Sequence, residues 1–150
     1  MDNLRELETL LAQKRRLGGA LLSFDGYDRW GAQHDTPENR ARVEADAAHA
    51  QAEHVAVVEQ LVALVARLRT EDPAAIERWA DLHCELLRAF VATCEGAEQG
   101  SSAAVGAFVA NEEMAGWGAV KRGEKAFVEE NGFYVSVDRA RYAAAFGIEV

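Results

Sequence analysis

The sequence has little proline, little cysteine and no long apolar run. It contains two prolines and two cysteines among 150 residues. Because proline interrupts helices, its scarcity leaves room for long ones, and so few cysteines exclude a disulfide-stabilised fold. The longest apolar run, residues 61–66, is too short for a membrane span, which takes about 20 residues. We therefore expect no membrane contact.

The two cysteines, Cys84 and Cys94, fall within one expected helix. Ten helical residues separate them by about 15 Å along the axis, too far for a mutual disulfide. We predict two free thiols in a reducing compartment. The acidic, amphipathic first residues also lack the apolar core of a signal peptide, so the expected location is cytoplasmic.

Alanine is abundant, with 29 residues in the chain. Alanine favours helix because it loses no side-chain entropy when a helix forms. The hydrophobic fraction of 49% and the charged fraction of 27% are typical of globular domains. A chain of 150 residues suits one domain with its own core. We predict a single all-α domain over residues 1–150.

Apolar residues recur at helical spacing along most of the chain, which predicts an amphipathic helix bundle. Thr36-Pro37 and Asp72-Pro73 are each typical of a helix start, a capping side chain followed by proline. The aromatic-rich residues 24–31 are expected to form a loop whose rings pack onto the bundle. Short connections favour antiparallel neighbours, here an αα-hairpin of the second and third helices. The expected fold is an antiparallel bundle of about four main helices, at residues 3–22, 37–69, 73–94 and 102–117.

The third and fourth expected helices differ in their apolar faces. In the third, Trp79, Leu87 and Phe90 lie on one continuous apolar stripe and are predicted to be core. In the fourth, Val105, Phe108, Val109 and Glu112 lie along one face, and many small residues permit close approach of a neighbouring helix.

The C-terminal region is expected to add a further helix, an extended segment and a last short helix. Residues 119–130 look helical, and Asn131-Gly132 would end that helix in a left-handed conformation. Residues 133–137 alternate β-type apolar residues with others, which predicts an extended segment. That segment would lie across the bundle or pair with a second copy, so monomer and homodimer both stay open. Asp138 is expected to cap the terminal helix, which Gly147 ends.

The charge of the chain is acidic and uneven. The net charge is −9, and residues 71–100 hold two basic against seven acidic residues, which accounts for −5. A field of this sign repels nucleic acid and attracts basic partners. We therefore expect a basic protein partner and no nucleic acid. The candidate binding residues are Glu77, Asp81, Glu85 and Glu95.

Two groups of residues raise the question of a metal site. Asp46 and His49 have the acid-x-x-His spacing of carboxylate-bridged helical bundles, and Glu53 follows four residues later. Such a site needs a second pair of this kind, which the sequence lacks, so we expect a surface cluster. His54 and His83 lie on core-facing stripes and are expected to be partly buried and hydrogen-bonded. No metal or other cofactor is expected.

Arg78 and His83 have the arginine-x4-histidine spacing that resembles the motif of the HEPN superfamily of small helical ribonucleases. The resemblance covers six residues. It implies that His83 would act as acid and base while Arg78 stabilises phosphate charge. The chain departs from the usual pattern at Trp79, where the family has a polar residue, and the surrounding acidity opposes RNA binding.

The profile of size, charge and simplicity favours a non-enzymatic binding or regulatory protein, such as an immunity protein, an antitoxin or a small chaperone. Two enzymatic alternatives remain. One is a metal-binding helical-bundle enzyme with His and carboxylate ligands, and the other is the ribonuclease. No other catalytic motif is present, although a triad can assemble from distant residues.

Overall fold

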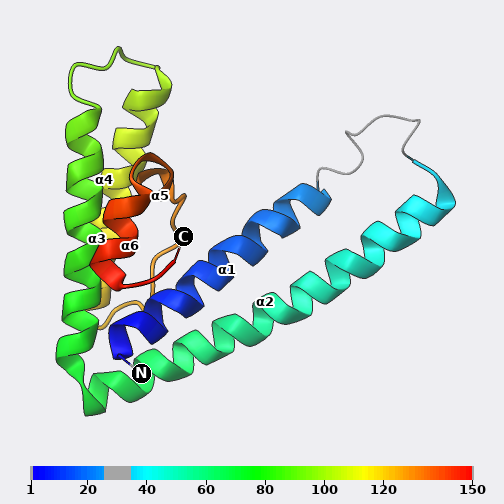
Figure 1. Cartoon of the computed structure of the whole chain (residues 1–150), viewed down its shortest axis with the longest axis horizontal. Helices are drawn as coiled ribbons and strands as arrows, with labels where there is room; N and C mark the ends of the chain where they lie inside the picture. Colours follow the sequence, from blue (N-terminus) through cyan, green and yellow to red (C-terminus); the bar gives the residue numbers. More distant parts are fainter. Residues whose placement is uncertain (1, 26–34, 150) are drawn as a thin grey trace. The chain divides into compact units, whose positions relative to one another are not determined.

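The computed structural model describes residues 2–25 and 35–149, and within these ranges it is helical and contains no strand (Figure 1). The predicted all-α fold with four main helices is confirmed. Beyond residue 25, the predicted aromatic loop lies outside the described residues. The described helices are α1 (Asn3–Asp25), α2 (Pro37–Glu71), α3 (Pro73–Thr93), α4 (Ser102–Lys121), α5 (Phe133–Val137) and α6 (Arg139–Phe146).

Side-chain caps explain where several helices begin. Oxygens of Thr36, Ser101 and Asp138 each accept the backbone N–H three residues later. Asp72 precedes α3 as predicted but makes no such cap. Its Oδ2 instead accepts a hydrogen bond from Asn3 Nδ2 at 2.8 Å. The connection between α2 and α3 is shorter than the expected bounds 37–69 and 73–94 imply, because only Asp72 separates the two helices.

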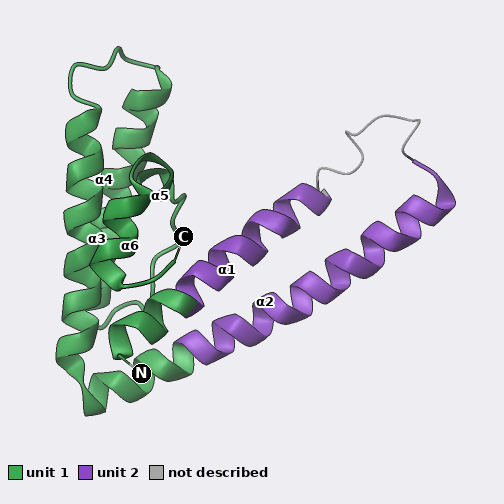
Figure 2. Ribbon diagram, in the orientation of Figure 1, with its two compact units in different colours: residues 1–9, 62–150 green, residues 10–61 purple. Residues whose placement is uncertain are grey.

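The chain divides into two compact units, coloured separately in Figure 2. Unit 2 comprises Leu10–Leu61 and therefore holds most of α1 and the first part of α2. These two helices pack along each other. The buried apolar residues of unit 2 are Leu11, Leu17, Val43, Ala50 and Leu61.

Unit 1 comprises Met1–Thr9 and Val62–Val150. Its centre is the pair α3 and α4, which run antiparallel and pack along their length, with α5 and α6 against α3 (Figure 1). The predicted core residues Trp79, Leu87 and Phe90 are buried, which confirms the face assigned to α3. A Cβ added to Gly106 would lie 3.1 Å from Phe90, so this glycine lets α4 approach α3 closely.

The predicted helix over residues 119–130 is wrong, because α4 ends at Lys121 and residues 122–132 are not helical. Tertiary contacts hold this segment instead. Glu113 Oε1 accepts the backbone N–H of Asn131 at 2.7 Å. A Cβ on Gly116 would lie 2.9 Å from Val128 Cγ1. Because glycine has no side chain, Val128 of this segment packs directly against the backbone of α4. Local helix propensity is overridden here by packing.

The predicted extended segment at residues 133–137 is also wrong, since these residues form the helical turn α5. Gly132 adopts the expected left-handed conformation, with φ 67°, but it begins α5 and does not end a preceding helix. The turn buries Tyr134 and leaves Phe133 and Val137 exposed. Asp138 caps α6 and Gly147 ends it, as predicted. None of the helices in the described ranges is long and apolar enough to cross a bilayer.

Candidate functional site

A fully buried carboxylate lies at the centre of unit 1. Glu8 Oε2 accepts a hydrogen bond from Trp79 Nε1 at 2.8 Å and lies 2.7 Å from His83 Nε2. Glu8 Oε1 accepts a hydrogen bond from the hydroxyl of Tyr142. All four residues are 0% exposed. A buried charge is costly unless it is paired and hydrogen-bonded, so these partners are what makes the position of Glu8 tolerable.

The other ring nitrogen of His83 faces Tyr134 and Glu130. His83 Nδ1 lies 2.7 Å from the Tyr134 hydroxyl and 3.5 Å from Glu130 Oε2. The Tyr134 hydroxyl donates to Glu130 Oε2 at 2.5 Å, so its oxygen is left to accept from His83 Nδ1. The imidazole of His83 thus lies between the carboxylates of Glu8 and Glu130 and has a polar partner at each ring nitrogen. The Glu8–His83 network consists of Glu8, Trp79, His83, Glu130, Tyr134 and Tyr142.

Aromatic rings enclose the imidazole of His83. The ring of Trp117 stacks on it, with 4.1 Å between centroids and 7° between planes. Trp79 meets Trp117 edge-on at 4.8 Å, and the ring of Phe146 lies 5.0 Å from His83. Because these rings exclude water, each hydrogen bond inside the shell is electrostatically stronger than it would be at the surface.

The Glu8–His83 network connects parts of unit 1 that are distant in sequence. It takes Glu8 from α1, His83 from α3, Glu130 from the non-helical segment, Tyr134 from α5 and Tyr142 from α6. A carboxylate, imidazole and phenol in series can pass a proton, but His83 has no exposed surface on which a substrate could act. The network therefore acts in this conformation as a structural centre of unit 1.

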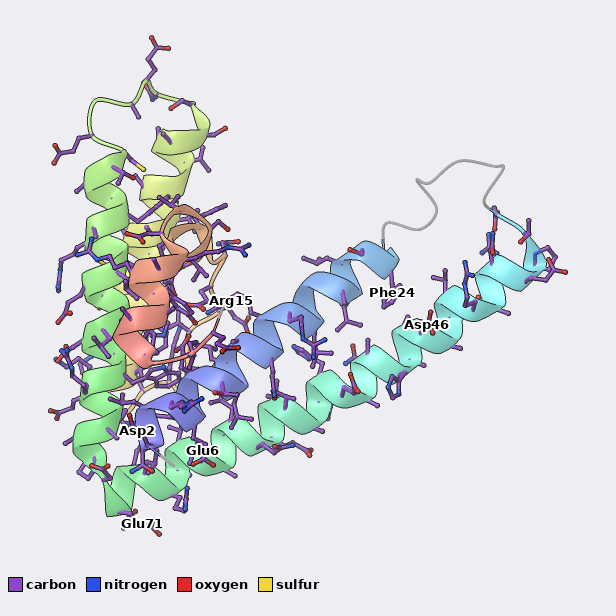
Figure 3. The ribbon with its side chains drawn as sticks, in the orientation of Figure 1. Asp2, Glu6, Arg15, Phe24, Asp46 and Glu71 are labelled. Atoms are coloured by element: carbon purple, nitrogen blue, oxygen red, sulfur yellow. The ribbon has the colours of Figure 1, made fainter. Side chains whose placement is uncertain are left out.

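Sequence reasoning expected a partly buried, hydrogen-bonded His83 and missed its partners. A signal for Glu8 was present, because Glu8 follows Leu4 by four residues and precedes Leu11 by three, which places it on the apolar stripe of α1. Glu6, two residues before Glu8 and labelled in Figure 3, occupies a surface position. Its Oε2 lies 3.9 Å from Arg67 Nη2. No local pattern marks the side chain of Glu130 as buried.

The acidic residues proposed as a binding surface divide into two kinds. Asp81 Oδ1 accepts from Lys121 Nζ at 2.8 Å, and this hydrogen bond and charge raise the pKa of Lys121 above its usual value. Glu85 Oε1 accepts from Arg78 Nη1 at 3.1 Å. Intramolecular cations therefore offset both acids. Glu77 is exposed on the same helix, whereas Glu95 lies beyond the end of α3, in the α3–α4 loop.

The surface cluster on α2 is as expected. His49 Nε2 lies 3.2 Å from Glu53 Oε1, and their side chains are 77% and 49% exposed. Asp46, labelled in Figure 3, is also exposed. His54 belongs to unit 2 and is half-buried. Among the described residues, no group of three or more His, Cys, Asp or Glu side chains is arranged to hold a metal ion.

The two residues of the ribonuclease-like spacing lie in different environments. His83 is enclosed in the core, whereas the Arg78 side chain is 53% exposed and pairs with Glu85. A ribonuclease would need both groups at one phosphate, so this geometry gives that interpretation no support.

An exposed apolar pair lies on α4, on the face that the sequence assigned to Val105, Phe108 and Glu112. Val105 is 52% exposed and Phe108 is 66% exposed. The buried side of α4 is formed instead by small residues together with Glu113 and Trp117. We call Val105, Phe108 and Glu112 the α4 outer face. An aromatic side chain this exposed gives up the free energy that its burial would supply.

The thiols of Cys84 and Cys94 are free, as predicted. Cys84 is buried, and burial raises the pKa of its thiol. Such a thiol is a packing residue and a poor nucleophile at neutral pH.

Comparison with models of known protein families, with curated proteins and with solved structures found no match to this chain.

Proposed function

We propose that this domain is a non-enzymatic binding protein that recognises a basic protein partner through the α4 outer face and the adjoining α3–α4 loop. The observation that carries the proposal is the exposure of Phe108, 66%, next to Val105, 52%, one helical turn away. Neighbouring exposed apolar side chains are typical of interaction sites, and aromatic residues supply much of the energy of protein interfaces.

Acidic residues without a neighbouring cation would attract the basic partner. Glu95 and Glu98 in the loop and Glu112 on α4 are exposed, and within the described part of the chain no cation pairs with them. Asp81 and Glu85, by contrast, already have cations beside them. Of the acids selected from sequence, Glu77 and Glu95 form no ion pair among the described residues, and Glu95 is the one in the loop that adjoins the α4 outer face. A partner with basic residues around an apolar group would match this surface.

The proposal is tested by finding a partner and then locating its contact. The tagged chain is cross-linked in cell extract, bound proteins are identified by mass spectrometry, and one purified partner is measured by surface plasmon resonance. We expect Phe108→Ala to weaken binding by about tenfold or more, mainly through faster dissociation. Leu22→Ala, at a residue of α1 that is 73% exposed, is the matched control and should change nothing.

The contribution of the loop acids is measured separately, through the rates of association and dissociation. Reversing both loop acids, Glu95→Lys with Glu98→Lys, should slow association more than it speeds dissociation, and the effect should shrink at high salt. Reversal of Glu44, exposed on α2, is the control. A partner that binds equally well to the Phe108 and loop variants would remove the proposal, as would a partner with an acidic contact surface.

A further inference from the structure

A small pocket opens beside the Glu8–His83 network, between α3 and the C-terminal helices. Its volume, including the open mouth, is about 320 Å³. Much of that space is open to solvent, so the pocket encloses only part of a small occupant. The lining residues come from α3, α5 and the start of α6, and they are Leu86, Ala89, Phe90, Thr93, Tyr134, Val137, Asp138 and Arg141.

The walls of the pocket are mainly apolar. Leu86, Ala89 and Phe90 form the α3 side, and Val137 faces them from α5. Tyr134 contributes to the lining, but its hydroxyl is already bonded to Glu130 and lies 2.7 Å from His83. A ligand therefore meets apolar surface in this pocket, which favours an apolar body.

The cation at the pocket is Arg141, and the lining also holds one acidic residue, Asp138. Arg141 lines the pocket and is exposed, and no carboxylate among the described residues forms an ion pair with its guanidinium. Asp138 also lines the pocket, but its Oδ1 accepts the backbone N–H of Arg141 at 2.9 Å and so caps α6. A guanidinium presents paired N–H donors that match a carboxylate.

We propose that this pocket binds a small monocarboxylate with an apolar body, whose carboxylate pairs with Arg141 while the body lies against Leu86, Phe90 and Val137. This ligand site is separate from the partner surface proposed above and does not depend on it. The Tyr134 ring in the lining also belongs to the Glu8–His83 network, so an occupied pocket touches the structural centre of unit 1.

The test uses 3-phenylpropionate as the probe and its neutral amide as the matched ligand. Binding is followed by NMR through the methyl signals of Leu86 and Val137. Few-atom ligands bind weakly, so saturation in the millimolar range is expected, with the carboxylate about tenfold tighter than the amide. Arg141→Gln should weaken the carboxylate about tenfold and leave the amide unchanged.

Two further variants locate the ligand. Arg139→Gln removes an exposed cation of α6 that does not line the pocket, and it should bind both probes like the parent chain. Ala89→Phe fills the pocket from α3 and should abolish the binding of both. The proposal would be overturned by equal binding of acid and amide, or by an Arg141 variant with unchanged affinity. It would also be overturned if the NMR shift changes were confined to other residues or if neither probe bound.

Discussion

Two histidines of this chain lie beside a glutamate, one pair in each unit, and their surroundings differ completely. In unit 2, His49 Nε2 is 3.2 Å from Glu53 Oε1, and the two side chains are 77% and 49% exposed. In unit 1, His83 Nε2 is 2.7 Å from Glu8 Oε2, and both side chains are 0% exposed. Water can replace the partner in the first pair and cannot do so in the second.

The difference shows why one pair was visible in the sequence and the other was not. His49 and Glu53 are four residues apart on one helix, so helical geometry alone brings them together. Glu8 and His83 are 75 residues apart, and only tertiary packing joins them. An exposed pair of this kind contributes little to stability, whereas removal of one member of a buried pair is costly.

The largest effect is expected for Glu8→Ala. The substitution leaves His83, Trp79 and Tyr142 without their shared acceptor inside the core. Loss of one partner from a buried pair costs about 3–5 kcal/mol, measured as the free energy of unfolding in urea with tryptophan fluorescence. Glu6→Ala, two residues earlier and half-buried, should cost far less. Equal losses in the two variants would contradict the role given to Glu8.

An apolar truncation measures how much of the stability of unit 1 is ordinary packing. Leu87 is 1% exposed on α3. Leu87→Ala should lower the free energy of unfolding by about 2–5 kcal/mol, because it removes buried methyl groups and leaves a cavity. Val62→Ala, at a residue that is 44% exposed, serves as the reference in the same urea titration. A loss below about 0.5 kcal/mol for the Leu87 variant would mean that the α3 face is assigned wrongly.

His83→Gln separates hydrogen bonding from ring stacking in the network. Glutamine can still form a hydrogen bond to Glu8. It has no ring, so it cannot contact Glu8 and Tyr134 from opposite sides as the imidazole does, and it cannot stack on Trp117. Because a buried group is left unsatisfied, the expected loss is about 1–3 kcal/mol in urea unfolding. The near-UV circular dichroism should also change, since Trp117 loses its stacked neighbour. An unaltered near-UV spectrum would argue against the stack.

The same substitution in the exposed pair gives the smallest effect. His49→Gln should change the free energy of unfolding by less than about 0.5 kcal/mol, because the pair is solvated and screened. The measurement is repeated at low and high salt, and any small loss should vanish at high salt. A loss that matched the His83 variant would erase the distinction between the two pairs.

The main helices could be predicted from the sequence because their signals are local. The apolar face of α3 and the caps at Thr36 and Asp138 all follow from residues within a few positions of one another. The segment at residues 122–132 could not be predicted, because contacts with α4 hold it. Asn131 donates its backbone N–H to Glu113, and Val128 packs against Gly116. The turn α5 was missed because an apolar alternation over five residues also fits a helical turn that buries one tyrosine.

The site was less predictable than the fold. The sequence indicated a buried His83, but its partners Glu8, Tyr134 and Glu130 lie on three other segments of the chain. The acids of α3 were correctly placed on the surface, yet their cations Arg78 and Lys121 could not be assigned without the three-dimensional arrangement. Charge counting gives the sign of a surface, and only geometry tells which charges are already compensated.

The contact between Glu8 and Tyr142 also sets an order of events during synthesis. The two residues are 134 positions apart, and at about 5–20 residues per second a ribosome needs about 7–27 s to add the second after the first. Until Tyr142 is added, Glu8 lacks one of the donors that surround it in the folded domain. The core of unit 1 therefore closes only after residue 142 has been added, 134 positions after Glu8.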